Sequence, residues 1–343
     1  MTDFLDLNAD DRRAIYTTIG AKIGKSAEVL EKDVWVCWTL DALFTTPSQV
    51  TMAFKGGTSL SKIYNAIARF SEDVDVTLDH RDLRPGLDPF TPGLSSRVRK
   101  AQTEDMNAAV RAHLTGAVIP HLTQRLTDAL PAGYGALEVS ADGESVRIYY
   151  PSALGTGPAD YLSNSVLLEF GGRNMVEPNE IHRVVPYLAA EQPTLTFPTA
   201  TVTVLRAERT FWEKATLAHA ECNKPVFRSS TDRLSRHWYD LYMLADSPIG
   251  RNALHDAPLL VDVVKYKSVV YYSAAADYSS CLTGGMRLVP DDAAVEALAA
   301  DYRAMINNGM FDGDAPTINE IVLRLTTLEE EVNARIPAAL AAQ

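Results

Sequence analysis

The stretch that decides the fold runs from Lys55 to Val76 and reads KGGTSLSKIYNAIARFSEDVDV. Residues 50–55 predict a short strand, which the pair Gly56-Gly57 interrupts before a helix begins. Residues 73–78 then predict a second strand with period-two alternation. We expect its inward residues to be Val74, Val76 and Leu78 and its outward residues to be Asp73, Asp75 and Thr77.

The two aspartates carry the first chemical signal. Asp73 and Asp75 stand at positions i and i+2, so their carboxylates share one face of the strand about 6.6 Å apart. Carboxylates are ligands that Mg²⁺ prefers, and two such ions can activate a hydroxyl and neutralise a pyrophosphate leaving group. The alternative is a strand that shows acids to water, which is the commoner origin of an isolated D-x-D.

The glycine turn adds a second signal. Gly56-Gly57 lets the backbone approach a ligand closely, and Thr58 and Ser59 lie where a helix N-terminus presents N–H groups to an anion. The alternative is a tight strand-to-helix turn with a cap. The turn is not a Walker A loop, because GK[ST] is absent. The order of strand, turn, helix and acidic strand is more specific than either feature alone.

Composition limits the classes of protein. The 343 residues, 46% hydrophobic and 22% charged, suit about two globular domains or one large one. The formal charge of −12 argues against broad coating of nucleic acid. The three cysteines have no metal or disulfide spacing, no apolar run reaches about 20 residues, and the acidic N-terminus lacks a signal-peptide core. We expect a cytoplasmic protein that does not bind a membrane.

Periodicity predicts an α+β fold with a mixed sheet in the first two-thirds of the chain and a helical C-terminal region. The expected domains are 1–205 and 206–343; the family resemblance given below implies that the second contributes to the active site. A proline-rich loop covers 81–94. Further strands are expected at 136–141, 145–150, 163–170 and 200–205. Helices are expected at 9–23, 26–45, 95–130 with a bend at Pro120, 207–221, 233–246, 257–271, 291–306 and 317–340, the last with a capping box formed by Thr317 and Glu320.

The motifs together resemble a known family. The residues Gly57, Thr58, Ser59 and Asp73-Val74-Asp75 are similar to the signature of DNA polymerase β-like nucleotidyltransferases. The longer segments that contain these residues, together with motifs elsewhere in the chain, resemble the AbiEii/AbiGii toxin family, to which the MenT toxins belong. Its matching segments are FKGGTSLSKIY, RFSEDVDV, EKDVW (31–35), ERTFWEKATLAHAE (208–221), RHWYDLYML (236–244), RLVP (287–290) and DYRAM (301–305). The resemblance covers about residues 30–306.

The resemblance implies a polymerase β-like nucleotidyltransferase core and a function. The enzyme would transfer a nucleoside monophosphate from an NTP to an acceptor, with two Mg²⁺ and release of pyrophosphate. Mn²⁺ is the alternative ion. The implied acceptor is the 3′ end of a tRNA. The implied setting is a type IV toxin–antitoxin or phage-defence system with a cognate antitoxin as partner.

The resemblance also implies roles for residues outside the decisive stretch. Lys214 would bind triphosphate oxygens and act in catalysis, and Asp240 would orient Lys214, accept a proton or bind the nucleotide. Glu169 is the candidate third metal ligand beside Asp73 and Asp75. The alternatives are a strand-end glutamate facing water, a solvated lysine, and a structural ion pair of Asp240 with Arg236.

Two further segments have open interpretations. Residues 222–236 carry Lys224, Arg228, Arg233 and Arg236 with one acid, so they are either a contact for RNA or nucleotide or a solvated loop. The segment 31–33 braces the sheet if Trp35 and Trp38 are core residues. Rival functions are nucleotidylation of a protein hydroxyl, a binding module with a degenerate nucleotide site, and a metal nuclease, which would need neither the glycine turn nor pyrophosphate release.

Overall fold

The computed structural model describes residues 2–88, 90–131, 135–155, 164–224 and 233–342. Contacts between Cα atoms divide the chain into two compact units. Unit 1 comprises Met1–Ile63, Phe70–Leu87 and Glu104–Leu205, and unit 2 comprises Tyr64–Arg69, Asp88–Thr103 and Arg206–Gln343. The fold is a mixed α+β architecture, as the sequence predicted.

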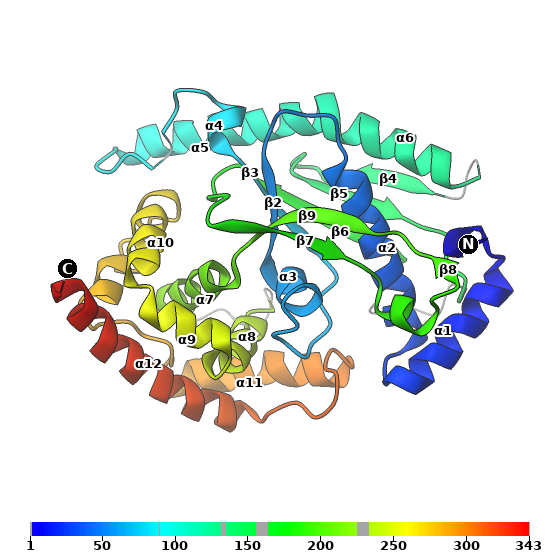
Figure 1. Ribbon diagram of the computed structural model, residues 1–343. Helices are drawn as coiled ribbons and strands as arrows, with labels where there is room; N and C mark the ends of the chain where they lie inside the picture. The colour runs from blue at the N-terminus through cyan, green and yellow to red at the C-terminus, as the bar shows by residue number, and fades with distance from the viewer. Residues whose placement is uncertain (1, 89, 132–134, 156–163, 225–232, 343) are drawn as a thin grey trace. The chain divides into compact units, whose positions relative to one another are not determined.

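Unit 1 is built on a seven-stranded mixed sheet with the strand order β4-β5-β6-β3-β2-β9-β7 (Figure 1). The two central strands are antiparallel to each other, and each has a parallel partner on its other side. The strands are β2 (Met52–Lys55), β3 (Val74–Leu78), β4 (Ala136–Val139), β5 (Ser145–Tyr149), β6 (Ser165–Gly171), β7 (Asn179–Val184) and β9 (Ala200–Leu205). A separate pair joins β1 (Thr2–Asp3) to β8 (Leu195–Thr196).

The helices of unit 1 begin where the sequence supplies capping residues. Asn8 caps α1 (Ala9–Ile23) and Ser26 caps α2 (Ala27–Phe44), which packs on β6 and β9. The remaining helices that lie at least partly in this unit are α3 (Gly56–Lys62), α4 (His80–Leu83), α5 (Ser96–His113), the π-helical η2 (Leu114–Val118), α6 (Ile119–Ala129), and the 3₁₀ turns η1 (Phe4–Asp6) and η3 (Tyr187–Glu191).

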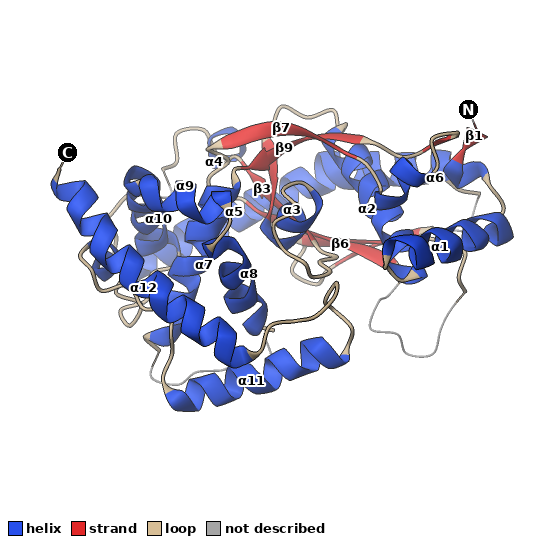
Figure 2. Cartoon of the chain, turned by 60° about the horizontal axis from the view of Figure 1, so that its bottom comes forward, coloured by secondary structure: helices blue, strands red, loops and turns tan. Residues whose placement is uncertain are grey.

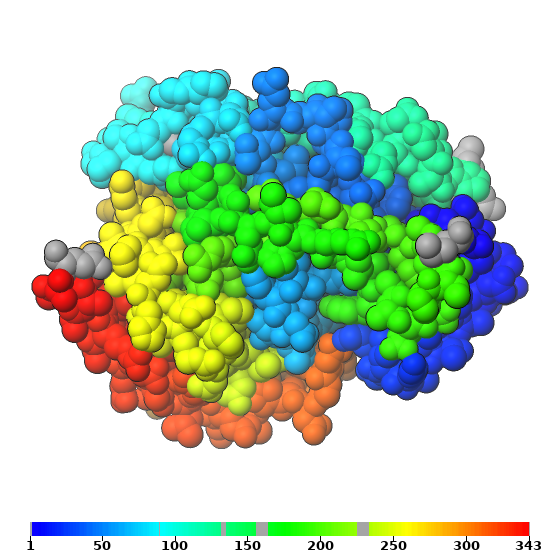
Figure 3. All heavy atoms as spheres, viewed as in Figure 1, coloured from blue at the N-terminus to red at the C-terminus, as the bar shows by residue number. Residues whose placement is uncertain are grey.

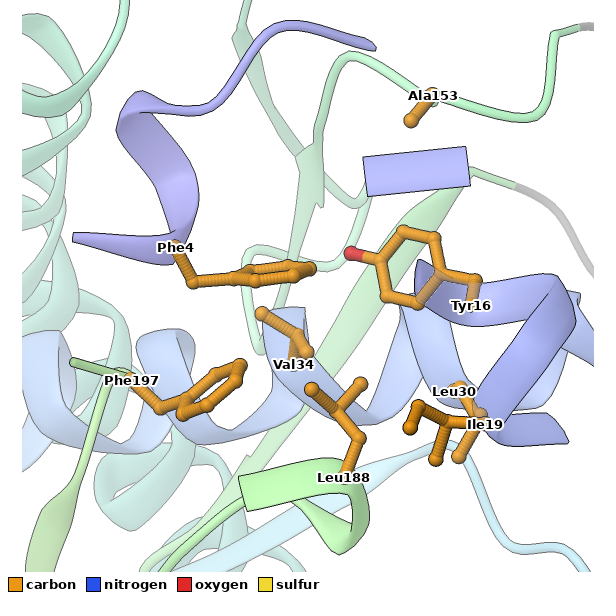
Figure 4. Packing of buried hydrophobic residues seen from close by; sticks show 8 residues of the cluster. All are labelled: Phe4, Tyr16, Ile19, Leu30, Val34, Ala153, Leu188 and Phe197. Carbon is orange, nitrogen blue, oxygen red and sulfur yellow. The ribbon is translucent and has the colours of Figure 1, made fainter. Parts of the chain in front are cut away.

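An apolar cluster closes the N-terminal end of this unit. Phe4 lies between Tyr16 of α1 and Phe197, with ring centroids 5.4 and 4.9 Å apart (Figure 4). Val34 of α2 and Leu188 of η3 complete the contact, and all of these side chains are buried. Burial of such aromatic surface ties η1 and α1 to the helix that lies on the sheet.

Unit 2 is helical over most of its length. α7 packs against α8, α9 and α10, and α12 lies along α8, α9 and α10 (Figure 2). The predicted capping box of Thr317 and Glu320 is present at the start of α12. The helices are α7 (Ala207–Cys222), α8 (Ser235–Ala245), α9 (Pro248–His255), α10 (Ala257–Val270), η4 (Tyr278–Leu282), α11 (Asp292–Asn307) and α12 (Ile318–Ala341).

The expected orientation of Thr77 is wrong, and three elements were not predicted. Thr77 faces a covered surface, because its side chain is fully buried and donates to the carbonyl of Asn174. The strand β7 was not predicted, because it is an edge strand exposed on both faces and so lacks an apolar alternation. Its segment forms part of the visible green surface in Figure 3. The helices α4 and α9 were also missed, being too short to show a clear period.

No helix in the described part of the chain is both long enough and apolar enough to cross a membrane.

Candidate active site

The sheet of unit 1 places four side chains in one row. Asp75 of β3 is the register partner of Lys55 on β2 and of Glu169 on β6, and Glu169 is in turn the partner of Ser145 on β5. Register partners in neighbouring strands point to the same face of a sheet. The row therefore brings one acid to each of the adjacent strands β3 and β6, beside a lysine.

Asp73 extends the acidic face along the chain. It directly precedes β3, and the half-buried Asp73 and Asp75 enclose the fully buried Val74. This alternation is the one predicted for the acid pair. Glu169 is exposed and lies inside β6 rather than at its end. Because it is the register partner of Asp75, its carboxylate lies on the same face of the sheet as that aspartate.

The acids suit a divalent cation by chemical type, since hard cations prefer carboxylate oxygens. The two carboxylates on adjacent strands, with Asp73 next along the chain, form the donor set from which such an ion could be held. Within the residues that the structure describes, no group of three or more His, Cys, Asp or Glu side chains is close enough as placed to enclose an ion.

The glycine turn is shaped around Asp75. Gly56 has φ +83°, a left-handed conformation that L side chains rarely adopt, and a Cβ built on it would lie 2.1 Å from Oδ2 of Asp75. Gly57, which the sequence analysis singled out for close approach, is buried in the first turn of α3. Gly56 is thus the glycine whose missing side chain makes room for the carboxylate.

The hydroxyls of the turn are used inside the protein. Thr58 Oγ1 donates to the carbonyl of Asp73 at 2.5 Å and lies 2.9 Å from Ser71 Oγ, and Ser59 Oγ donates to the carbonyl of Gly56 at 2.9 Å. Both side chains are buried. Thr58 therefore ties the turn to the backbone that carries the acid pair, and any phosphate contact from this turn would come from backbone N–H groups.

Two consecutive residues of α2 form ion pairs at the two ends of the segment that connects the glycine turn to the acid pair, residues 62–72. Lys32 forms an ion pair with Glu72, the residue before Asp73, and Asp33 forms an ion pair with Lys62, the last residue of α3. Asp33 also accepts the backbone N–H of Tyr187 at 2.6 Å, and the Lys62 ammonium lies 3.7 Å from the centroid of that tyrosine ring. We call these two ion pairs the α2 brace.

The brace decides the open question about the segment 31–33. Trp35 and Trp38 are core residues, as the bracing interpretation required, and both are buried. Lys32 and Asp33 of the brace are themselves almost inaccessible to water. A buried ion pair restricts geometry strongly, because breaking either partner leaves an unpaired charge in the interior.

Unit 2 contains the other predicted residues in one buried cluster. Asp240 of α8 is fully buried and accepts from Nε and Nη2 of Arg69 at 2.7 and 2.8 Å. The Nζ of Lys214 on α7 lies 2.9 Å from the same carboxylate and 3.4 Å from Nδ1 of His237. Lys214 is 6% exposed, so it is not a solvated lysine, and Asp240 pairs with Arg69 rather than with Arg236.

Charges in this cluster shift the pKa values of its members. Burial acts against the charged form of Asp240, but Arg69 and Lys214 outweigh it and hold the pKa of the carboxyl well below its ordinary value. Burial lowers the pKa of Lys214, with Asp240 opposing the shift. Burial and the neighbouring Lys214 also hold the pKa of His237 well below its ordinary value, so this imidazole is neutral near pH 7.

Several residues of these clusters were not identified from the sequence. Arg69 and Asp240 are 171 positions apart, and no local pattern links them. Lys55 could have been found from its place at the end of the strand that precedes the glycine turn. In the basic loop, Lys224 pairs with Glu221, while Arg228 lies outside the described residues.

Comparison with known proteins gives the chain a family. The structure is similar to MenT4, a nucleotidyltransferase toxin from Mycobacterium tuberculosis H37Rv, with a TM-score of 0.51, 18% identity, and coverage of 98% of this chain and 99% of that one. A search of curated protein sequences finds no match. The family model for the nucleotidyl transferase AbiEii toxin of type IV toxin–antitoxin systems matches residues 38–324. The chain therefore belongs to the AbiEii family of nucleotidyltransferase toxins, whose type IV systems pair such an enzyme with an antitoxin.

Proposed function

We propose that this toxin transfers a nucleoside monophosphate from an NTP to a hydroxyl at the 3′ end of a tRNA. The acceptor oxygen forms a bond to the α-phosphorus, the bond from that phosphorus to the bridging oxygen breaks, pyrophosphate leaves, and the hydroxyl proton passes to water. The observation that carries the proposal is the row of Lys55, Asp75 and Glu169 beside a glycine turn, in a chain of this family.

The chain's residues have separate proposed roles. Asp73 and Asp75, with Glu169, hold Mg²⁺, which when bound neutralises phosphate charge and activates the acceptor hydroxyl. The turn at Gly57, Thr58 and Ser59 positions the phosphates of the nucleotide. These assignments are supported by the shared face of the carboxylates and by the room that Gly56 leaves for Asp75.

Lys214 is the proposed cation for the triphosphate and the departing pyrophosphate, and Asp240 orients it. The support is that two basic side chains converge on one acid in a buried cluster, so the acid does not balance both. The lowered pKa of Asp240 favours an orienting role over proton transfer, because a carboxylate held ionised is a poor base.

The test is transfer from α-labelled NTPs, each incubated with total RNA and with total protein in Mg²⁺. We expect label on RNA that has gained a nucleotide and is not shortened, and a loss of about 1000-fold in Asp75→Asn, because metal chemistry supplies several kcal/mol. Asp128→Asn on the exposed face of α6 is the matched control and should behave as wild type. Label on protein alone would replace the acceptor, shortened RNA would indicate a nuclease, and no label would indicate a binding module.

A further inference from the structure

One surface of unit 2, outside the buried cluster of Asp240, combines exposed aromatic rings with basic side chains. The start of α5 and the residues after α10 meet there, since the guanidinium carbon of Arg99 lies 4.1 Å from the ring centroid of Tyr272. Both segments belong to unit 2. We define the basic aromatic surface as Arg97, Val98, Arg99, Lys100, Tyr271 and Tyr272.

The two tyrosines are exposed and held in place. Tyr272 is 56% exposed and Tyr271 is 42% exposed, so both rings present surface to water. The ring of Tyr271 packs edge-on against Tyr266 at 5.8 Å, with the Lys267 ammonium 4.7 Å from its centroid. Each ring is therefore preorganised, so little conformational entropy would be lost if a flat group stacked on it.

Arg99 is also fixed. Its Nη1 donates to the carbonyl of Leu94 at 2.6 Å and its Nη2 lies 3.2 Å from Ser96 Oγ. These bonds hold the guanidinium over Tyr272, while the neighbouring side chains of Arg97 and Lys100 are exposed to water.

The local charge is the reverse of the charge of the whole chain. Residues 94–103 contain three basic side chains and no acid, and residues 263–276 contain two basic side chains and no acid, whereas the chain carries −12. The acid preceding the second segment, Asp262, is bound by Nη1 of Arg209 at 2.7 Å. The basic side chains of these two segments would therefore attract an anionic partner at short range.

We propose that the basic aromatic surface binds single-stranded RNA, with bases stacked on Tyr271 and Tyr272 and phosphates contacted by Arg97 and Lys100. This inference rests on the proposed function in taking RNA as the acceptor. Exposed rings beside basic residues are the combination that single-stranded nucleic acid requires, since every base offers a flat face and every linkage a negative charge. An acidic protein, the alternative occupant of this surface, would bind Arg97 and Lys100 through its carboxylates but would supply no flat bases to stack on the two tyrosine rings.

The experiment measures binding of a fluorescent single-stranded RNA oligonucleotide by anisotropy, without NTP or metal. The variants are Tyr272→Ala, Tyr271→Ala/Tyr272→Ala and Arg97→Glu/Lys100→Glu, with Arg335→Glu on the exposed face of α12 as the matched charge control. Each ring removed should weaken binding by about 5- to 140-fold. The Arg97→Glu/Lys100→Glu variant should also make binding less dependent on salt, and Arg335→Glu should leave Kd near that of wild type.

The outcomes separate this inference from the function on which it rests. Thermal unfolding checks that each variant is folded. Because every replaced side chain is exposed and Arg99 is retained, we expect Tm to be unchanged. Wild type that binds no RNA, or ring variants that bind as wild type does, overturns the proposal. If polyglutamate displaced the labelled RNA as well as unlabelled RNA does, binding would depend on charge and not on stacking, and the proposal would also be overturned. Binding that needs the rings, in a protein that transfers no nucleotide to RNA, supports the surface and overturns the proposed acceptor instead.

Discussion

At the scale of single residues, Asp240 shows how neighbours decide what a carboxylate can do. The sequence left three roles open for it: orientation of Lys214, proton transfer and nucleotide binding. Two basic partners within 2.9 Å and full burial favour the first, because both carboxylate oxygens are contacted by basic side chains and the pKa is held low. Its removal should therefore disturb stability as well as activity.

We predict that Asp240→Asn costs about 3–5 kcal/mol in the free energy of unfolding, because Arg69 and Lys214 would remain buried without a counter-charge. Lys214→Ala should cost less, since Asp240 keeps its two bonds to Arg69. Urea unfolding of the three proteins at pH 7 measures the difference. A smaller loss in Asp240→Asn than in Lys214→Ala would contradict this reading of the cluster.

The same group predicts a pH dependence. A carboxyl whose pKa is lowered on folding contributes stability that is present above its ordinary pKa of about 3.9 and is lost as the pH falls through the folded value. The difference in unfolding free energy between wild type and Asp240→Asn should therefore be constant near neutrality and shrink below about pH 4. A difference that stays the same from pH 7 to pH 3 would show that the carboxylate is not stabilised by its partners.

Gly56 supports a second residue-scale prediction. Gly56→Ala places a Cβ against the carboxylate of Asp75 and requires a left-handed backbone, so Asp75 must move. A displacement of about 1 Å in a reacting group can cost about 100-fold in rate. Transfer activity at saturating Mg²⁺ is the measurement, and Gly86→Ala, also left-handed but with nothing within 4 Å of its Cβ, controls for backbone strain alone. Equal losses in the two variants would remove the contact with Asp75 from the explanation.

At the scale of elements, α2 does more than cover the sheet. Through Lys32 and Asp33 it holds the end of α3 and the start of β3, the two ends of the segment that connects the glycine turn to the acid pair. Neither residue is part of the proposed chemistry. We infer that they position the elements that are.

A double-mutant cycle tests the positioning role. Lys62→Met and Asp33→Asn should each cost several kcal/mol in stability, while the double variant should recover much of the loss, since neutral replacement of a buried pair is often tolerated. If the pair positions the turn, the recovered double variant should still have a raised KM for NTP. Recovery of both stability and KM would make the brace purely structural.

An exposed pair of the same unit supplies the comparison. Lys22 of α1 and Glu191 of η3 also form an ion pair, but the lysine is largely exposed. The corresponding cycle on this pair should give a coupling energy of about 0–1 kcal/mol and no change in KM.

At the scale of the whole molecule, membership of a toxin family gives a cellular expectation. Induced expression of the chain without its antitoxin should arrest growth, and Lys214→Ala should relieve the arrest. Alanine removes the cation and keeps the helix, because it is the best helix former. Lys214→Arg should restore little, since a planar fork does not replace a compact charge that is fitted to one carboxylate.

Growth after induction is the readout, with soluble protein measured in parallel and Lys224→Ala on an exposed side chain as the control. Undiminished arrest in the Lys214→Ala strain would remove Lys214 from the mechanism. No arrest with wild type would count against the toxin role in that host and leave the transfer assay as the test of chemistry.

The sequence by itself determined the elements whose signals are local. The helix expected at 26–45 and the strand expected at 73–78 were predicted from apolar spacing and are present as Ala27–Phe44 and Val74–Leu78. The capping box at Thr317 was predicted from two residues three positions apart. Caps, turns and periodicity depend on neighbours within a few residues, so a single sequence contains them. The D-x-D pair and the glycine turn are likewise local features that can be recognised within a few consecutive residues.

Only the tertiary structure decided which side chains meet. In the folded chain Glu169 is the register neighbour of Asp75, and Asp240 pairs with Arg69 rather than with Arg236. Thr77, on the face expected to be open, is buried and donates to the carbonyl of Asn174. These contacts join segments that are many residues apart, and their energy depends on burial and on the final distance between charges. Neither quantity exists until the strands have paired and the helices have packed.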